Sequence, residues 1–298
     1  MKKTDRRKMI ASGVIAFMLL LCSGIGIIHG NDEEIGDFRN IAGLNFVNDS
    51  ALTVDVNIPE TVNIYKEKED AVVIKADVEK QLKVKNGTKN IRNYKRLCAE
   101  FDVPAGYRTV LDSYIENGYS AYDVFTAYEF LHDRFGTLDD FKDILEQAAS
   151  GKAWEDIFAD FNKVYSEYVP TEYEIEVLDE IFAHKDITVD QVKIAEFLAY
   201  RGLIDFDEHI GRRKEGVSFQ EIAEEIGLLN VSGAVQSVMV LEEEVKHCVE
   251  ELNMSEGEAF ARLAAVKTSN APMKKTMEYV RSGKSGEKIM KEYFDEKN

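Results

Sequence analysis

A short turn phrase recurs six times between Gly118 and residue 298. Each copy has a residue suited to ending a helix, a Ser, Thr or Ala two positions later, and a small or aliphatic residue four positions after that. Gly and Asn tolerate the left-handed conformation that ends a helix, and Ser or Thr followed three residues later by an acid or amide caps the next one. Each phrase therefore predicts a tight turn between two helices. The copies are Gly118/Ser120/Val124, Gly151/Ala153/Ile157, Asp186/Thr188/Val192, Gly216/Ser218/Ile222, Asn253/Ser255/Ala259 and Gly283/Ser285/Ile289.

The spacing of the phrases indicates a repeat protein. They follow one another at intervals of 33, 35, 30, 37 and 30 residues, which is typical of helical hairpins that bury their apolar faces on neighbouring hairpins. A longer period of about 66 residues is superimposed on these intervals. Leu131, Leu198 and Leu263 are separated by 67 and 65 residues, and Phe141, Phe206 and Met273 are separated by 65 and 67. We therefore expect a mainly α fold: an array of helical hairpins over residues 89–298, extended as an α-solenoid or folded back as a bundle.

The N-terminal residues are typical of an export signal. Residues 1–8 form a basic cytoplasmic tail with five cations, and residues 9–28 contain no charged side chain. A helix of about 20 residues spans the roughly 30 Å core of a bilayer, and cations before it favour a cytoplasmic N-terminus. We expect a single-pass signal anchor in the cell membrane, with the bulk of the chain extracytoplasmic. Small residues between Cys22 and Gly26 leave open a cleaved signal peptide and a secreted protein.

Residues 31–88 follow a different pattern. Apolar and polar residues alternate over 52–58, again over 62–64 and again over 72–78, with many β-branched side chains. This alternation favours short strands, so we expect a small β-rich juxtamembrane region. The alternative is a helix that begins at Pro59 and runs through Lys85, because Glu, Lys and Ala are also frequent there.

The net charge narrows the choice of partners. The whole chain carries −18, and because residues 1–8 hold +4, the remainder carries −22. Such a surface repels nucleic acid and anionic membranes, and it favours a basic partner or a cation-rich wall, although dispersed acids also suit a simple solvated surface. Cys98 and Cys248 both lie in apolar-periodic stretches, so buried thiols are expected rather than a disulfide.

Two segments carry a family resemblance. Ser218-Phe219-Gln220-Glu221-Ile222 through Gly227, and Gly151-Lys152-Ala153-Trp154 through Ile157, resemble helical-hairpin repeats of uncharacterised Firmicutes surface and exported proteins. The resemblance rests on Gly, an aromatic residue and Ile at fixed spacing, and the copies at Ser255 and Ser285 lack the aromatic residue. It implies an architecture and an envelope location, and no activity.

Several local patterns imitate functional motifs. Ser218 to Ser237 imitates a helix-turn-helix, but Glu215 to Val245 contains no Lys or Arg for phosphate contacts. The five histidines lack zinc-site spacing, and His132-Asp133 and Asp207-Glu208-His209 are expected to form separate surface contacts, since neighbours on a helix diverge. We assign no catalytic, cofactor-binding or metal-binding residue, and the binding residues stay unknown.

The aromatic residues offer one candidate surface. Trp154 stands where another copy has Phe219, so it is expected in the core. Tyrosines are crowded into the first repeats and would form a peptide or glycan contact surface if several share one exposed face. These tyrosines are Tyr107, Tyr114, Tyr119, Tyr122, Tyr128, Tyr165, Tyr168 and Tyr173.

The function we expect is that of a membrane-anchored extracytoplasmic binding or scaffold protein, with a protein or peptide partner in the cell envelope and no nucleic acid. One alternative is an envelope enzyme that acts on cell-wall material through paired carboxylates. A second is a signalling component that acts through another membrane protein, and a third, disfavoured by charge, is a DNA-binding protein. The sequence does not specify the oligomeric state.

Overall fold

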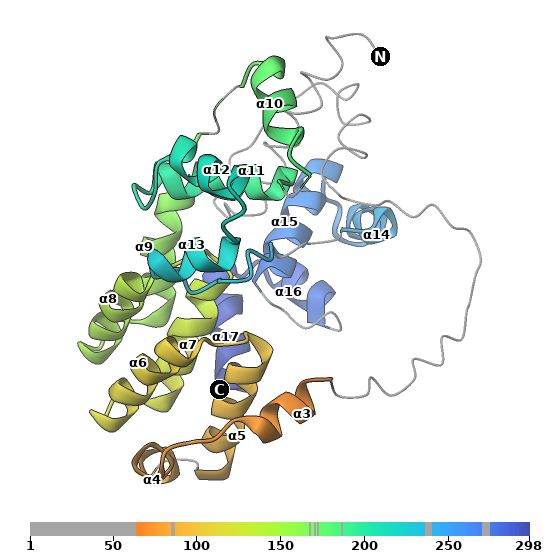
Figure 1. The fold of residues 1–298 in the computed structure, drawn as a ribbon. Helices are drawn as coiled ribbons and strands as arrows, with labels where there is room; N and C mark the ends of the chain where they lie inside the picture. The colour runs from red at the N-terminus through yellow and green to blue at the C-terminus, as the bar shows by residue number, and fades with distance from the viewer. Residues whose placement is uncertain are drawn as a thin grey trace. The chain divides into compact units, whose positions relative to one another are not determined.

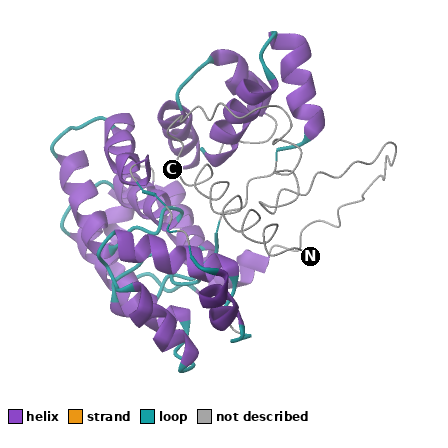
Figure 2. Cartoon of the chain, turned by 90° about the horizontal axis from the view of Figure 1, so that it is seen from above, coloured by secondary structure: helices purple, strands orange, loops and turns teal. Residues whose placement is uncertain are grey.

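The described residues of the chain are almost entirely helical. A computed structural model describes residues 64–84, 87–166, 168–169, 171, 173–185, 187–235, 240–269 and 275–298. Their regular elements are all α-helices (Figure 1) joined by loops (Figure 2). Within these ranges, β pairing is limited to an isolated antiparallel bridge between Thr137 and Leu228. The prediction of a mainly α chain is confirmed.

The described helices are α3 (Ile64–Ala71), α4 (Ala76–Val84), α5 (Gly87–Glu100), α6 (Ala105–Glu116), α7 (Ala121–His132), α8 (Leu138–Ala149), α9 (Trp154–Ser166), α10 (Ile175–Phe182), α11 (Val189–Tyr200), α12 (Phe206–Lys214), α13 (Phe219–Glu225), α14 (Glu242–Leu252), α15 (Glu256–Thr268), α16 (Thr276–Ser282) and α17 (Gly286–Lys297).

The prediction of a β-rich region over residues 31–88 is wrong wherever the structure describes that stretch. Residues 64–84 form α3 and α4, and α5 already begins at Gly87. The alternation over 72–78 has two parts: residues 72–75 link the helices, and Val78 begins an i, i+4 pair with Leu82 on the buried face of α4. Helix-forming Ala, Glu, Lys and Leu outweigh the short alternation. Residues 31–63 of this prediction lie outside the described residues.

The six recurring phrases form inter-helix turns, as predicted. They join α6 to α7, α8 to α9, α10 to α11, α12 to α13, α14 to α15, and α16 to α17. Gly118, Gly151 and Gly216 share a φ of 88° or 89°, and Asn253 and Gly283 are also left-handed. Asp186 lies outside the described residues.

The last position of each phrase enters the core. The exposed fraction of the six side chains is 6% or less. Capping varies more than predicted: Thr188 with Gln191 and Ser218 with Glu221 form reciprocal capping boxes, whereas Ser120 makes no side-chain cap bond. The described turns therefore share a left-handed residue followed by a buried side chain. These buried side chains are Val124, Ile157, Val192, Ile222, Ala259 and Ile289.

The longer period of the sequence is present in the helix order. The helices α7, α11 and α15 begin at residues 121, 189 and 256, and α8, α12 and α16 follow them at 138, 206 and 276. Leu131, Leu198 and Leu263 lie 10, 9 and 7 residues after the first residue of α7, α11 and α15, and each has an exposed fraction of 0%. Each of these three helices packs against the helix that follows it.

The described residues divide into two compact units, and the first of them includes α3 and α4, which precede the predicted 89–298 repeat domain. This unit comprises the described residues of 64–153, Leu228–Asn230 and Phe294–Asn298, and is called here the α3–α8 unit. In it α5 packs against α3, α4 and α7, while α6 and α8 pack against α7. Consequently every side chain from Val124 to Leu131 of α7 is buried. Its core includes Tyr94, Leu97, Leu111, Ile115, Phe125, Tyr128, Phe141 and Leu145.

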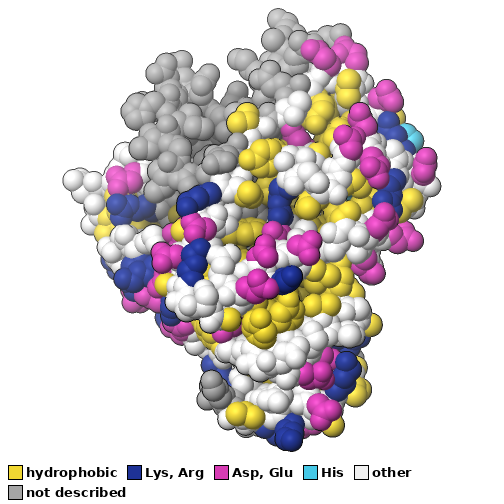
Figure 3. All heavy atoms as spheres, turned by 90° about the vertical axis from the view of Figure 1, so that its left-hand side faces the viewer, with side chains coloured by type: hydrophobic (Ala, Val, Ile, Leu, Met, Phe, Trp, Pro, Cys, Tyr) yellow, Lys and Arg dark blue, Asp and Glu magenta, His cyan; other side chains and the backbone are white. Residues whose placement is uncertain are grey.

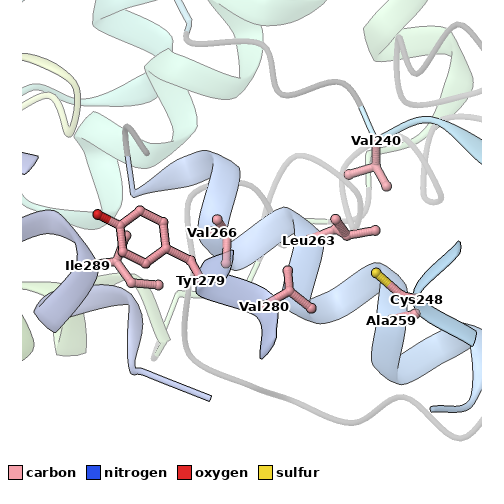
Figure 4. Close-up of a cluster of buried hydrophobic side chains, with 8 residues drawn as sticks. All are labelled: Val240, Cys248, Ala259, Leu263, Val266, Tyr279, Val280 and Ile289. Carbon is pink, nitrogen blue, oxygen red and sulfur yellow. The ribbon is translucent and has the colours of Figure 1, made fainter. Parts of the chain in front are cut away.

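The other unit comprises the described residues of Trp154–Gly227 and Val231–Tyr293, and is called here the α9–α17 unit. Within it, α10, α11 and α12 enclose one apolar cluster around Ile181, Val192 and Ile210. A second cluster lies between α14, α15, α16 and α17, where Cys248, Leu263 and Tyr279 are fully or nearly buried (Figure 4). The hairpins of both units are thus held by apolar packing.

No helix among the described residues is both long enough and apolar enough to cross a membrane. The predicted span at residues 9–28 and the basic tail at residues 1–8 lie outside the described residues.

Candidate interaction surfaces

The histidines do not converge on a metal site. No group of three His, Cys, Asp or Glu side chains in the described ranges is placed to hold a metal ion. His132 and Asp133 do contact one another, with 3.2 Å between Nδ1 and Oδ1, so the expectation of separate contacts is wrong for this pair. Asp133 is the C-cap of α7 and keeps a helical backbone conformation, so adjacent positions at a helix end can still bring their side chains into contact.

His209 is the most unusual of the histidines. Its side chain on α12 has an exposed fraction of 0%, and neither ring nitrogen has a hydrogen-bond partner among the described residues. The ring lies against Phe219, with 5.9 Å between centroids. Burial lowers the pKa of His209 to about 4, and Arg213 and Arg212 contribute to the shift. The imidazole is therefore neutral at physiological pH and acts as a packing group.

The two described cysteines are buried free thiols, as predicted. Burial raises the pKa of Cys98 to about 12, and it raises that of Cys248 as well. Since the thiolate is the reactive form of cysteine, both thiols are inert at neutral pH.

A buried carboxylate lies in the α3–α8 unit, at Glu129 of α7. The exposed fraction of Glu129 is 2%. Its Oε1 lies 3.0 Å from the guanidinium of Arg96 on α5, and its Oε2 lies 2.6 Å from Nζ of Lys297. Burial raises the pKa of Glu129, although Lys297 and Arg96 oppose the shift.

Amide side chains complete this cluster. Asn93 donates to the backbone oxygen of Lys297 at 3.2 Å, and Asn298 accepts from Arg96 at 3.0 Å and donates to Thr126. The enzyme alternative would require an accessible acid with a raised pKa beside a second carboxylate. Glu129 has the raised pKa, but two cations enclose it, so this cluster serves to hold the last turn of α17 on α5 and α7.

A shallow depression of α8 lies near two partly exposed tyrosines on the surface of the same unit, and together they are called here the tyrosine–carboxylate groove. Tyr114 of α6 and Tyr119 of the following turn meet edge to face, with 5.0 Å between ring centroids, and Tyr114 also packs on Phe141 of α8. Beside them α8 lines an open, shallow depression with Asp143, Glu146, Gln147 and Ser150. Burial raises the pKa of Tyr114, and the charges of Glu146 and Asp143 add to the shift, which places both carboxylates near its hydroxyl.

The groove combines two features that suit a cation. Aromatic rings attract a guanidinium or ammonium group, and carboxylates bind the same groups by charge-assisted hydrogen bonds. Gln147 is held by Lys152, whose Nζ donates to its Oε1 at 2.7 Å. Lys152 thus adds one cation at the edge of the depression, and the carboxylates of Asp143 and Glu146 are the groups there that suit an Arg or Lys side chain of a peptide.

The tyrosines as a set do not form one exposed face. Tyr107, Tyr128 and Tyr168 are buried, and the side chain of Tyr165 lies outside the described residues. Among the tyrosines that are not buried, Tyr114 and Tyr119 contact one another. Trp154 and Phe219 have exposed fractions of 7% and 6%, which confirms their expected place in the core.

The described residues after Ser218 do not form the helix-turn-helix that their sequence imitates. Helix α13 ends at Glu225, Gly227 takes a left-handed conformation, and residues 228–235 form no helix. Instead Leu229 donates its backbone N–H to the carbonyl of Gly136 at 2.9 Å. On the face drawn in Figure 3, acidic and basic side chains are interspersed with apolar ones.

Sequence reasoning missed a block of cations on α4 and α5. Lys80, Lys83, Lys89, Arg92 and Lys95 lie on these two helices, and we call them the basic face. Lys80, Lys83 and Arg92 are exposed, and Lys89 and Lys95 are partly exposed. A charge count in a sliding window would have found the block, because the average over the whole acidic chain conceals it.

The chain matches no protein-family model, and no curated protein or solved structure is significantly similar to it.

Proposed function

We propose that the chain is a membrane-anchored, extracytoplasmic helical-repeat protein that binds a protein or peptide partner of the cell envelope. The observation that carries the binding role is the tyrosine–carboxylate groove on α6 and α8. The uncharged run at residues 9–28 is preceded by cations and followed by acids, which supports the anchor and its orientation. The resemblance to repeats of Firmicutes surface proteins agrees with that location.

The partner is a peptide or protein segment with an exposed Arg or Lys. The edges of Tyr114 and Tyr119 provide an apolar contact, and Asp143 and Glu146 supply the charge. Interaction sites built from rigid aromatic side chains lose little conformational entropy on binding. Because the residues after position 8 carry −22, they also attract a basic partner over distances up to about one Debye length, roughly 8 Å in physiological salt.

Site-specific photo-crosslinking in cells tests the binding role. A photoreactive amino acid replaces Tyr119 in the full-length chain, and the matched control carries it at Tyr200, which is 43% exposed on α11. The proposal expects an adduct of defined mass from position 119, and loss of that adduct when Asp143 and Glu146 are both changed to Lys. An adduct that survives the charge reversal contradicts binding through the groove.

A separate experiment tests the location. A membrane-impermeant amine reagent applied to intact cells should acylate the exposed Lys185 and Lys246. Acylation of these lysines only after lysis would place the repeats in the cytoplasm and refute the extracytoplasmic assignment.

A further inference from the structure

The charge of the chain is divided very unevenly along its length. Residues 75–96 contain eight Lys or Arg and two acids, so this stretch carries +6. With +4 on residues 1–8 and −18 overall, everything else carries −28. A cation block in such an acidic chain is a distinct surface with its own partner chemistry.

The fold brings these cations together on two packed helices. Lys80, Lys83 and Val84 share one face of α4, since positions three and four apart are neighbours on a helix. Lys89, Arg92 and Lys95 follow one another at the same spacing along α5. Glu79 joins the two rows: it pairs with Lys83 at 2.6 Å, and the charge of Lys95 also lowers its pKa.

Most of the charge on this basic face is not neutralised by the residues that the structure describes. Lys80, Lys89 and Arg92 make no ion pair with any residue that the structure describes. The acids of the stretch are Asp77 and Glu79, and only the second is paired with a cation of the face. Val84, one turn beyond Lys80, has an exposed fraction of 71%. The surface thus presents free cations beside an exposed apolar side chain.

We propose that the basic face of α4 and α5 docks on anionic phospholipid headgroups of the membrane in which residues 9–28 are anchored. This inference rests on the proposed anchor. The 35 residues between Ile28 and Ile64 reach at most about 115 Å when extended, so the anchor keeps α4 and α5 within reach of that bilayer. Lys and Arg side chains bind anionic headgroups by charge, and exposed Val84 can enter the interface between them.

The acidic remainder of the chain fixes the orientation of this docking. Anionic lipid attracts the cations of the basic face and repels the acids that predominate in the rest of the sequence, so the face formed by α4 and α5 turns toward the bilayer. The attraction acts within about one Debye length, which is roughly 8 Å in physiological salt and roughly 3 Å in 1 M salt. Docking is therefore sensitive to salt and to lipid charge, whereas the anchor is sensitive to neither.

Lysine acylation of the full-length chain in vesicles tests the proposal. The chain is reconstituted in phosphatidylcholine alone and in phosphatidylcholine with phosphatidylglycerol, and acylation at each lysine is followed by mass spectrometry. We expect Lys80 and Lys89 to react several-fold more slowly on the anionic vesicles at low salt, with normal rates restored in 1 M salt. Lys246 on α14 is the internal reference and should react equally on both.

Charge-neutral variants sharpen the result. Lys80→Gln, Lys89→Gln and Arg92→Gln together should weaken docking roughly a hundred-fold, at about five-fold for each cation, and should abolish the protection of Lys83 and Lys95. The control triple Lys185→Gln, Lys246→Gln and Lys288→Gln removes the same charge from exposed positions and should leave that protection intact.

The outcomes separate this inference from the proposed anchor. If the chain floats with both vesicles but its basic face reacts equally on each, the docking inference is overturned and the anchor stands. Protection that appears on neutral vesicles and grows with protein density would identify a second copy of the chain as the occupant, and would likewise overturn it. A chain that floats with neither vesicle would refute the anchor, and the docking inference with it.

Discussion

The carboxylate of Glu129 on α7 lies 2.6 Å from Nζ of Lys297, in the last turn of α17, although the two residues are 168 positions apart in the sequence. The side chain of Glu129 is 2% exposed, and Arg96 occupies its other oxygen. Burial raises the pKa of Glu129 in spite of these cations, so the charged cluster is costly to desolvate. Its effect is to specify where the C-terminal turn of α17 packs.

Breaking this cluster should destabilise the α3–α8 unit. Glu129→Gln removes the buried carboxylate that contacts both Arg96 and Lys297, while Glu100 stays 3.6 Å and 3.5 Å from these two cations. Losing the charge-assisted hydrogen bonds to Glu129 should therefore cost about 1–3 kcal/mol. Urea unfolding followed by circular dichroism would measure the loss, with the exposed Glu116→Gln as the matched control. Equal unfolding midpoints for the two variants would show that the cluster does not stabilise the fold.

Acid should weaken the α9–α17 unit through His209. Its pKa is lowered from 6.5 to about 4, so the unfolded chain binds the proton more readily than the folded chain. The corresponding stability is fully present above pH 6.5, and up to about 3 kcal/mol is lost as the pH falls toward 4. In His209→Phe the melting temperature should depend less on pH over this range than it does in wild type or in the control His184→Gln. An unchanged slope in His209→Phe would contradict the assignment.

Substitution of the turn glycines should destabilise the fold because of their left-handed backbone conformation, not because of a steric clash. Gly216 has a φ of 89°, and a Cβ added there would meet no atom within 4 Å, so Gly216→Ala should cost about 1 kcal/mol from strain rather than from a clash. Gly216→Val should cost at least as much. Gly211, inside α12 and also in open space, provides the opposite control, because Gly211→Ala should stabilise the helix by a few tenths to about 1 kcal/mol. Changes in melting temperature that have the same sign for both alanine variants, relative to wild type, would refute this explanation of the turn.

Local features of the fold could be predicted from the sequence, and features created by packing could not. The turns at Gly118 and Gly216 were predictable because a left-handed conformation depends on the residue that adopts it. Helix over residues 64–84 was only the alternative to strands, because β-branched residues alternate by chance across the α3–α4 link and the start of α4. Short alternations of this kind do not distinguish strands from helices.

The candidate surfaces depend on tertiary neighbours in the same way. Glu129 is one position from Tyr128 on α7, and helical periodicity alone would place it at the edge of the apolar stripe. It is buried because α5, α6 and α8 all pack around α7. Tyr114 and Asp143 are 29 positions apart, and no spacing rule indicates that α6 and α8 bring them to one groove. The basic face is the exception, since local charge predicts it and only the averaging over the chain conceals it.

The most direct measurement of the central claim is photo-crosslinking from position 119 of the full-length chain in intact cells. The account predicts one major adduct with an envelope protein or peptide that exposes Arg or Lys, absent from position 200 and lost in the Asp143→Lys, Glu146→Lys variant. Circular dichroism of that variant, unchanged from wild type, excludes unfolding as the cause. The same adducts from positions 119 and 200, or an adduct from 119 that persists after charge reversal, would contradict binding through the tyrosine–carboxylate groove.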